Sequence, residues 1–274
     1  MRIGASIFLT DESIRPTRLA RELEQRGFHA LYVPEHTHIP VSRETPWPGG
    51  AELPREYGRT LDPFAALAAA AAVTERLHLG TGITLVAQHD PITLAKQVAT
   101  LDLLSGGRFT LGVGFGWNRE EADDHGVDWA ARRDVVREKV ALMRALWAPE
   151  PTGYQGVHVS VAPSVAHPKP SPPPRVLLGG GAGPVLFAHV AEYADGWMPV
   201  GGGGLAEALP RLRRVWQEAG RDPEALQVLP VSVQPSAGKL ARLRDLGVAE
   251  ITAQLPSAGT DEVLRTLDAY AQFL

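Results

Sequence analysis

The stretch "VLLGGGAGPVLF" (residues 176–187) joins a strand-like run to a helix-like run through a segment of glycines. Backbone N–H groups at glycine can approach a ligand closely, and those at a helix start are unpaired and favour an anion. The segment Gly179, Gly180, Gly181, Ala182 and Gly183 therefore predicts a phosphate site. A tight turn that needs glycine for its geometry alone is an equally good interpretation of these residues.

The same succession of strand and helix repeats on both sides of this stretch. Eight segments have the apolar character of buried strands: 2–8, 29–33, 77–86, 108–116, 175–180, 195–200, 225–233 and 248–255. Each is followed by a segment with helical signals: 16–27, 62–77, 90–107, 119–147, 183–194, 205–220, 239–247 and 260–274. Eight such units over about 250 residues predict an α/β protein with a (β/α)8 TIM-barrel fold. An open doubly wound sheet is the alternative.

Two segments depart from this alternation. Residues 39–61 form a long loop after the second predicted strand, and long loops in compact domains are commonly functional lids. Residues 148–174 are rich in proline and contain "GYQGVHVSV", which predicts a short hairpin. The alternation resumes directly after this second segment. We therefore expect one TIM-barrel domain over residues 1–274, with 148–174 as an insertion.

Composition narrows the class of protein. The chain of 274 residues has 27 basic and 31 acidic side chains, a net charge of −4 that argues against nucleic acid as a partner. It has no cysteine, which excludes disulfides, thiolate catalysis and cysteine metal sites. Its apolar runs are too short for a signal peptide at the N-terminus or for a membrane span. We expect a cytoplasmic protein that acts on a small molecule.

Polar side chains follow the second predicted strand in "VPEHTHIP". Glu35 and His36 come directly after apolar residues. A polar side chain that is buried at such a point needs a hydrogen-bond partner or has a role in function. Histidine changes its charge near neutral pH and is suited to proton transfer, so His36 is a candidate catalytic residue. A rim histidine that is merely hydrogen-bonded is the other interpretation. Zinc binding by His36, His38, His89 and Glu35 has only weak support from their spacing, and we expect no metal site.

The 39–61 loop also carries candidate substrate-binding side chains. Arg55 and Arg59 are positioned to hold an anionic group, and Trp47 is positioned to contribute to an apolar wall. Solvated charge and ordinary core packing are the alternatives for these residue types.

Several stretches, in this order, resemble the luciferase-like monooxygenase superfamily, and most closely its F420-dependent (deazaflavin) oxidoreductase branch. They are "LYVPEHTHIPVSRETPWPGG", "TLDPFAALAAAAAVTERLHLGTGI", "AKQVATLDLLSGGRFTLGVGFGWNREE", "LLGGGAGP" and "YADGWMP". The resemblance implies a TIM barrel with a flavin-type ring across its C-terminal mouth and the cofactor phosphate on residues 179–183. It also implies a non-prolyl cis bond at Gly82–Ile83 behind the ring and cofactor contacts from Gly114, Gly116 and Trp117.

The same resemblance implies an activity. It suggests an oxidoreductase that transfers a hydride between coenzyme F420 and an organic small molecule, with His36, oriented by Glu35, as proton donor. Some relatives carry a glutamate where this chain has Trp117, and the nearest carboxylates here are Glu120 and Glu121. An FMN-dependent luciferase-like monooxygenase, a flavin-binding protein without turnover and a phosphosugar isomerase are the alternatives. Family members are often homodimers.

Overall fold

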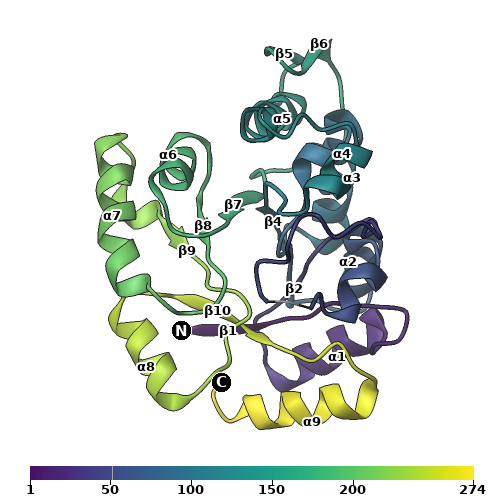
Figure 1. The fold of residues 1–274 in the computed structure, drawn as a ribbon, viewed down its shortest axis with the longest axis vertical. Coiled ribbons are helices and arrows are strands. Elements are labelled where there is room, and N and C mark those ends of the chain that lie inside the picture. Colours follow the sequence, from purple (N-terminus) through teal and green to yellow (C-terminus); the bar gives the residue numbers. More distant parts are fainter. Residues whose placement is uncertain (51) are drawn as a thin grey trace.

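A ring of parallel strands forms the centre of the molecule, and the helices surround it (Figure 1). The computed structural model describes residues 1–50 and 52–274. Within these residues, one sheet of eight parallel strands has the order β10-β1-β2-β3-β4-β7-β8-β9. The strands are β1 (Arg2–Ser6), β2 (Ala30–Val33), β3 (His78–Thr81), β4 (Phe109–Val113), β7 (Arg175–Gly179), β8 (Gly196–Met198), β9 (Gln227–Val228) and β10 (Glu250–Gln254).

The two ends of this sheet meet. Beyond the end of β9, Val233 N donates to Thr252 O at 2.9 Å, and Gln254 N donates to Val233 O at 3.0 Å. These bonds join the segment after β9 to β10, next to β1. The predicted TIM barrel is therefore confirmed, and the alternative of an open doubly wound sheet is wrong.

Helices follow the strands and begin at local sequence signals. Asp62 and Asp90 each precede a proline, and their side chains accept hydrogen bonds from Ala65 N at 2.7 Å and Thr93 N at 2.8 Å. The α-helices of the barrel are α1 (Pro16–Arg26), α2 (Pro63–Ala71), α3 (Pro91–Ser105), α4 (Arg119–Asp124), α5 (Arg132–Trp147), α6 (Pro184–Tyr193), α7 (Leu205–Glu218), α8 (Ala237–Asp245) and α9 (Thr260–Ala271). Short 3-10 turns are η1 (Arg55–Arg59), η2 (Val86–Gln88) and η3 (Pro223–Ala225).

The predicted continuous helix over 119–147 is wrong, because the structure divides it into α4 and α5. Asn118 caps the start of α4 by accepting a hydrogen bond from Glu121 N at 3.3 Å. Gly126 then adopts φ 68°, a left-handed conformation that glycine accepts and that ends a helix. Because of this break, α4 is not constrained to follow the direction of α5.

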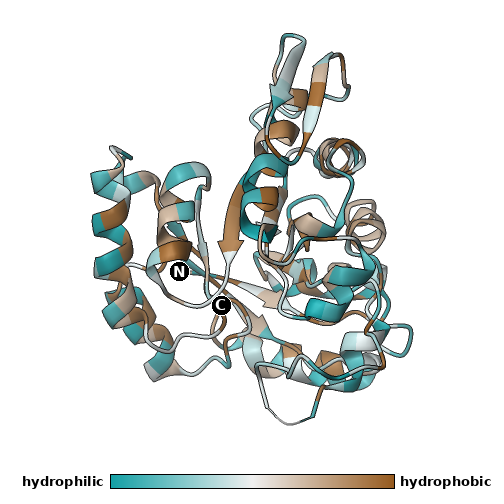
Figure 2. Ribbon diagram, turned by 45° about the horizontal axis from the view of Figure 1, so that its top comes forward, coloured by the Kyte–Doolittle hydropathy of each residue, from teal (hydrophilic) through white to brown (hydrophobic). Residues whose placement is uncertain are grey.

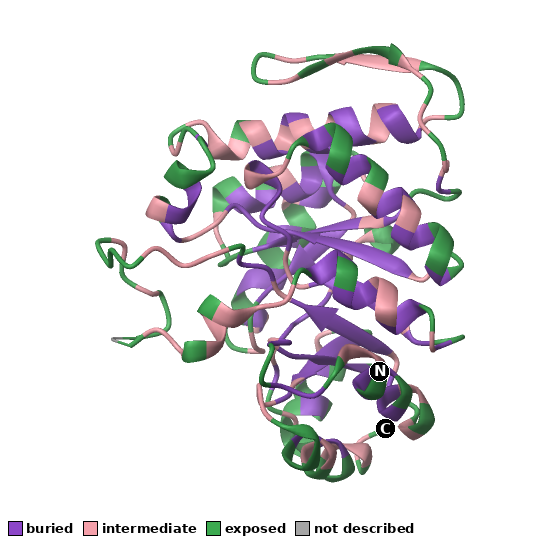
Figure 3. Cartoon of the chain, turned by 90° about the vertical axis from the view of Figure 1, so that its right-hand side faces the viewer, coloured by how far each residue is buried: buried purple, intermediate pink, exposed green. Residues whose placement is uncertain are grey.

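The predicted hairpin inside 148–174 is confirmed. Strands β5 (Thr152–Gln155) and β6 (Ser160–Ser164) pair antiparallel and stand beyond α5 at the top of Figure 1. Figure 3 shows that this hairpin is largely exposed or half-buried, in contrast to the buried central strands. Glu138 of α5 anchors it by accepting bonds from Val157 N at 3.0 Å and His158 N at 2.7 Å.

Hydrophobic side chains fill the space between the strands and the helices, and the outer helix surfaces are largely hydrophilic (Figure 2). A second, smaller cluster lies on the other face of the strands and includes Tyr32, Leu177 and Met198. Among the described helices, none is both long and apolar enough to cross a membrane.

Close strand packing predicts a specific stability effect at Gly112 in β4. A Cβ added there would lie 2.0 Å from the backbone oxygen of Thr81, so we expect Gly112→Ala to lower the free energy of unfolding by about 1–3 kcal/mol. Gly238 in α8 is the control: an added Cβ there meets no described atom within 4 Å, and alanine should stabilise the helix by about 0.5–1 kcal/mol. Urea denaturation measures both. Unchanged stability of Gly112→Ala would contradict this packing.

Candidate active site at the barrel mouth

A cavity of about 360 Å³ opens at the carboxyl ends of the barrel strands, the end where TIM barrels carry out chemistry. Most of its exposed lining is apolar, which is typical of a site for a small organic ligand. A larger cavity of about 600 Å³ lies at the opposite, amino end, beside Arg2, Arg175 and Glu250. His36 lines the cavity at the carboxyl end together with Gly82, Gly114, Gly116, Gly179 and Gly180, whereas Gly181, Ala182 and Gly183 are not among its described lining residues.

Ile83 forms the floor of this cavity, directly after β3. The Gly82–Ile83 bond is cis, as the resemblance implies. The Ile83 side chain occupies space that a Cβ would need on two neighbouring strands: 2.2 Å from the Cβ position of Gly114 and 2.7 Å from that of Gly179. Positions 114 and 179 therefore require glycine so that Ile83 can pack there.

The glycines after β7 have a different environment. An added Cβ at Gly181 or Gly183 would meet no described atom within 4 Å, so this backbone faces open space. Gly183 is the N-cap of α6 and offers no side-chain cap, and Pro184 opens the helix. The loop therefore has room for an anionic group beside a helix start, which is what a phosphate needs. Gly116, with φ 76°, lines the cavity on the β4 side next to Trp117.

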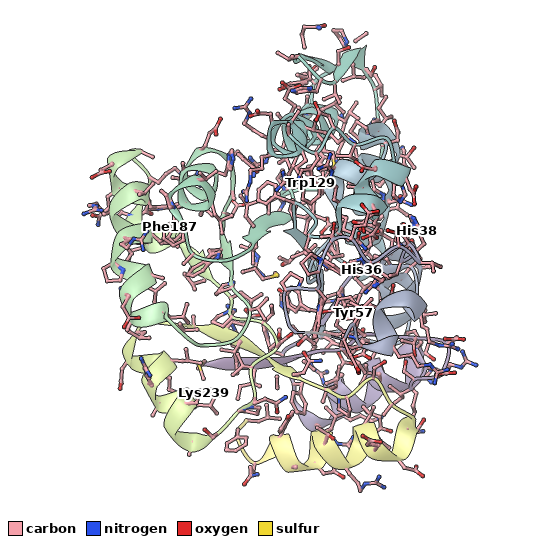
Figure 4. The ribbon with its side chains drawn as sticks, viewed as in Figure 1. His36, His38, Tyr57, Trp129, Phe187 and Lys239 are labelled. Carbon is pink, nitrogen blue, oxygen red and sulfur yellow. The ribbon has the colours of Figure 1, made fainter. Side chains whose placement is uncertain are left out.

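His36 extends from the end of β2 and lies between His38 and Tyr57 in the view of Figure 4. Its Nδ1 is 2.8 Å from Glu121 Oε2, and the two side chains are only 6% and 1% exposed. Trp117 Nε1 donates to His36 Nε2 at 3.4 Å, and an indole N–H can only donate. Nδ1 therefore carries the proton and donates a hydrogen bond to Glu121. The single lone pair of Nε2 accepts only the long 3.4 Å contact from Trp117, which a substrate hydroxyl can replace, so Nε2 is the candidate proton acceptor in the cavity wall.

The expectation that Glu35 orients His36 is wrong. The Glu35 carboxylate turns toward the segment after β3, where it accepts a bond from Leu85 N at 2.7 Å and lies 2.8 Å from His89 Nε2. Glu121 takes the predicted role instead. The capping residue Asn118 followed three positions later by Glu121 was the sequence signal for a helix start at this point.

The other histidines do not converge on His36. His38 lies 3.0 Å from Asp124 on the exposed side of α4, and His89 pairs with Glu35. Each of the three histidines thus contacts a different carboxylate. The described residues contain no group of three or more side chains that could hold a metal ion.

The 39–61 loop, of which residue 51 lies outside the described residues, contributes differently from expectation. Arg55 and Arg59 do not line the cavity, because they form ion pairs with Glu12 at 2.6 Å and Asp11 at 2.5 Å. Trp47 is also absent from the described lining and packs its ring 5.7 Å from that of Tyr57. Tyr57, which the sequence analysis missed, lines the cavity with its ring 5.3 Å from that of His36.

Helix α4 forms hydrogen bonds to the 39–61 loop as well as to His36. Glu120 accepts hydrogen bonds from the side chain and the backbone N–H of Thr45, and these bonds lower the pKa of Glu120 to about 2. The carboxylate is therefore charged at neutral pH and holds the loop against α4.

Arg133 is a second cavity residue that the sequence analysis missed, because a continuous helix over 119–147 gave its side chain no particular direction. Its guanidinium lies 4.4 Å from the ring centre of Phe115, and its Nη1 is buried without a hydrogen-bond partner among the described residues. The ring of Phe115 in turn lies 5.8 Å from that of His189 on α6, so Arg133 is close to that helix, and burial and then the charge of Arg133 lower the pKa of His189. Arg133 as a whole is half-buried, but a guanidinium nitrogen that is shielded from water without a partner favours an anion beside it.

Comparisons with known proteins identify relatives over most or all of the chain. The chain is 44% identical to an uncharacterised protein of Mycobacterium tuberculosis over 99% of this chain and 98% of the relative. It is 30% identical to the F420-dependent glucose-6-phosphate dehydrogenase of Beutenbergia cavernae, over 84% of this chain and 68% of the relative. The crystal structure of the monooxygenase RslO1 from Streptomyces bottropensis shares the fold, with a TM-score of 0.80 and 22% identity over 100% of this chain and 98% of that one.

A family model for the luciferase-like monooxygenases matches residues 11–260, which include the barrel strands and the cavity at their carboxyl ends. This chain therefore belongs to the luciferase-like monooxygenase family.

Proposed function

We propose that this chain is an oxidoreductase that transfers a hydride between coenzyme F420 and an organic small molecule at the barrel mouth. The observation that carries the proposal is the buried pair His36–Glu121, which leaves a proton-accepting nitrogen in the cavity wall. Hydride transfer from an alcohol requires removal of the hydroxyl proton, and such a nitrogen can take it. The F420-dependent relative from Beutenbergia cavernae supports the choice of cofactor.

The residues at the cavity suit a cofactor with a flat ring and a phosphate. Ile83 offers an apolar floor for the ring, and the open backbone at Gly181 and Gly183 offers N–H groups to the phosphate. Arg133 supplies a positive charge on the side of α6. When bound, F420 would supply the hydride acceptor or donor that the protein itself lacks.

The protein side of the reaction then follows from the contacts. His36 Nε2 accepts the hydroxyl proton during oxidation of an alcohol and returns it in the reverse direction. Glu121 acts as a positioning residue, because its carboxylate accepts a hydrogen bond from Nδ1–H and stabilises the imidazolium that forms. The indole N–H of Trp117 contacts Nε2 until a substrate hydroxyl takes its place there, and Tyr57 helps to cover the imidazole from water.

His36 should affect chemistry and leave cofactor binding intact. We expect His36→Ala to lower the rate of hydride transfer by about 10²-fold or more, the usual contribution of a general acid or base. The affinity for F420 should stay within about twofold, because the groups assigned to the phosphate are elsewhere. Single-turnover kinetics measure the rate. His38→Ala is the control, since His38 is exposed and contacts Asp124 outside the cavity. Equal rates in His36→Ala and the native protein would contradict the assignment.

A substitution at Gly181 tests the proposed phosphate site on residues 179–183. Valine at this position meets no described protein atom near its Cβ, so the fold should survive while the side chain occupies the space assigned to the phosphate. Loss of one or two charge-assisted bonds, each about 1.5–3 kcal/mol, should weaken F420 binding by about 10–10⁴-fold. Equilibrium titration measures this effect. Gly259→Val at the start of α9 is the control, because Gly259 also faces open space and precedes a helix other than α6. Native affinity in Gly181→Val would restore the interpretation as a simple turn.

The reaction type has its own test. With F420 in its reduced form and a ketone present, we expect cofactor oxidation to proceed without oxygen and to consume none in air. An oxygen electrode and the absorbance of F420, recorded under air and under nitrogen, distinguish the two types of reaction. A turnover that requires oxygen would identify a monooxygenase and contradict the proposed hydride transfer.

A further inference from the structure

The charges that line the cavity are unevenly placed. Glu35, His36 and Arg133 are the charged or readily titrated side chains of the described lining, apart from the phenol of Tyr57. Both oxygens of Glu35 are engaged, one by Leu85 N and the other by His89. This carboxylate therefore has its partners within the protein.

The remaining charged side chain is the cation Arg133. It lies on the side of the cavity where the glycine loop after β7 leads into α6. It packs on Phe115, whose ring lies 5.8 Å from that of His189 on α6, the helix that follows the glycine loop. In the proposed function this charge faces the cofactor phosphate.

The wall around His36 is aromatic. The ring of Tyr57 lies 5.3 Å from that of His36, and the ring of Trp117 lies 5.9 Å from it. Phe8 extends this wall with its ring 4.6 Å from Tyr57. Burial raises the pKa of Tyr57, so its phenol is uncharged at neutral pH.

Arg55 and Arg59 of the 39–61 loop supply no free positive charge to the wall around His36. Arg55 pairs with Glu12, and Arg59 pairs with both Asp11 and Glu12. A phosphate or carboxylate next to His36 would be desolvated against aromatic rings without a free cation among the described lining residues on that side. Such a burial is strongly unfavourable.

We propose that the substrate at His36 is an uncharged alcohol, or the corresponding ketone or aldehyde, with an apolar or aromatic body. The inference rests on the proposed function. In the oxidation, the carbinol C–H bond breaks and its hydride passes to F420, the O–H proton passes to His36 Nε2, and the C=O bond forms. The alcohol is oxidised and F420 is reduced. The proposal excludes phosphorylated sugars as substrates of this chain. In this it differs from the relative from Beutenbergia cavernae, which is named for glucose 6-phosphate.

A matched pair of ketones tests the inference. Acetophenone and 4-acetylbenzoate share one skeleton and differ by a carboxylate that is ionised at neutral pH. Isothermal titration into the complex with oxidised F420 measures binding without turnover, because that complex holds no transferable hydride. We expect acetophenone to bind at least about tenfold more tightly than 4-acetylbenzoate. Equal or tighter binding of the acid, or no binding of acetophenone up to its solubility limit, would overturn the proposal.

A charge placed beside His36 should reverse the preference. Tyr57→Arg introduces a cation into the aromatic wall and should raise the affinity for 4-acetylbenzoate relative to acetophenone by about tenfold or more. Val41→Arg adds the same charge to the same loop at a side chain that is 97% exposed, and it should leave the ratio unchanged. An equal shift in both variants would mean that overall charge, and not the wall at Tyr57, sets the preference.

Failure of the cofactor assignment and failure of the substrate class can be told apart. Titration with F420 in the absence of any ketone reports on the proposed function alone. If the protein bound FMN in place of F420, the same two ketones would be titrated into the FMN complex. The ratio of their affinities there would still support or overturn an uncharged substrate at His36.

Discussion

The side chain of Ile83 can occupy the centre of the barrel mouth only because two neighbouring strand ends carry no Cβ. β3, β4 and β7 are adjacent in the sheet, and Ile83 after β3 covers Gly114 after β4 and Gly179 at the end of β7. Any side chain at either glycine would collide with it, since the added Cβ would lie 2.2 Å or 2.7 Å away. This contact provides an apolar floor, and the walls and the glycine loop are arranged around that floor.

Helix α4 connects the chemistry to the loop above it. Its six residues hold His36 through Glu121, the 39–61 loop through Glu120 and Thr45, and His38 through Asp124. These contacts require α4 to be separate from α5, which the left-handed turn at Gly126 allows. The position of the proton-accepting nitrogen therefore depends on a break in the chain about five residues beyond the carboxylate that holds the histidine.

Local signals in the sequence were sufficient for the barrel. Apolar strand segments, the two Asp-Pro helix starts and the glycines after β7 act over a few residues, and each of these strands and helices lies within its predicted segment. Some strands are shorter than predicted: β3 covers His78–Thr81 of the predicted 77–86, and β9 covers Gln227–Val228 of the predicted 225–233. The hydrogen-bond and ion-pair partners of the site side chains depend on how distant segments of the chain meet, and no local sequence pattern encodes this. Glu121 meets His36 across 85 positions, and Arg55 meets Glu12 across 43. The resemblance implied Glu35 as the partner, but the two neighbouring side chains contact different parts of the chain: Glu35 contacts Leu85 and His89, and His36 contacts Glu121.

The central claim is that the barrel mouth holds F420, with the phosphate on the glycine loop and His36 at the reacting side. Equilibrium titration of the purified protein with F420 and, in parallel, with FMN tests this claim most directly. The account predicts saturable binding of F420 that is tighter than any binding of FMN, since Arg133 and the open loop suit an anionic tail that continues beyond the first phosphate. Tight binding of FMN without detectable binding of F420 would contradict it.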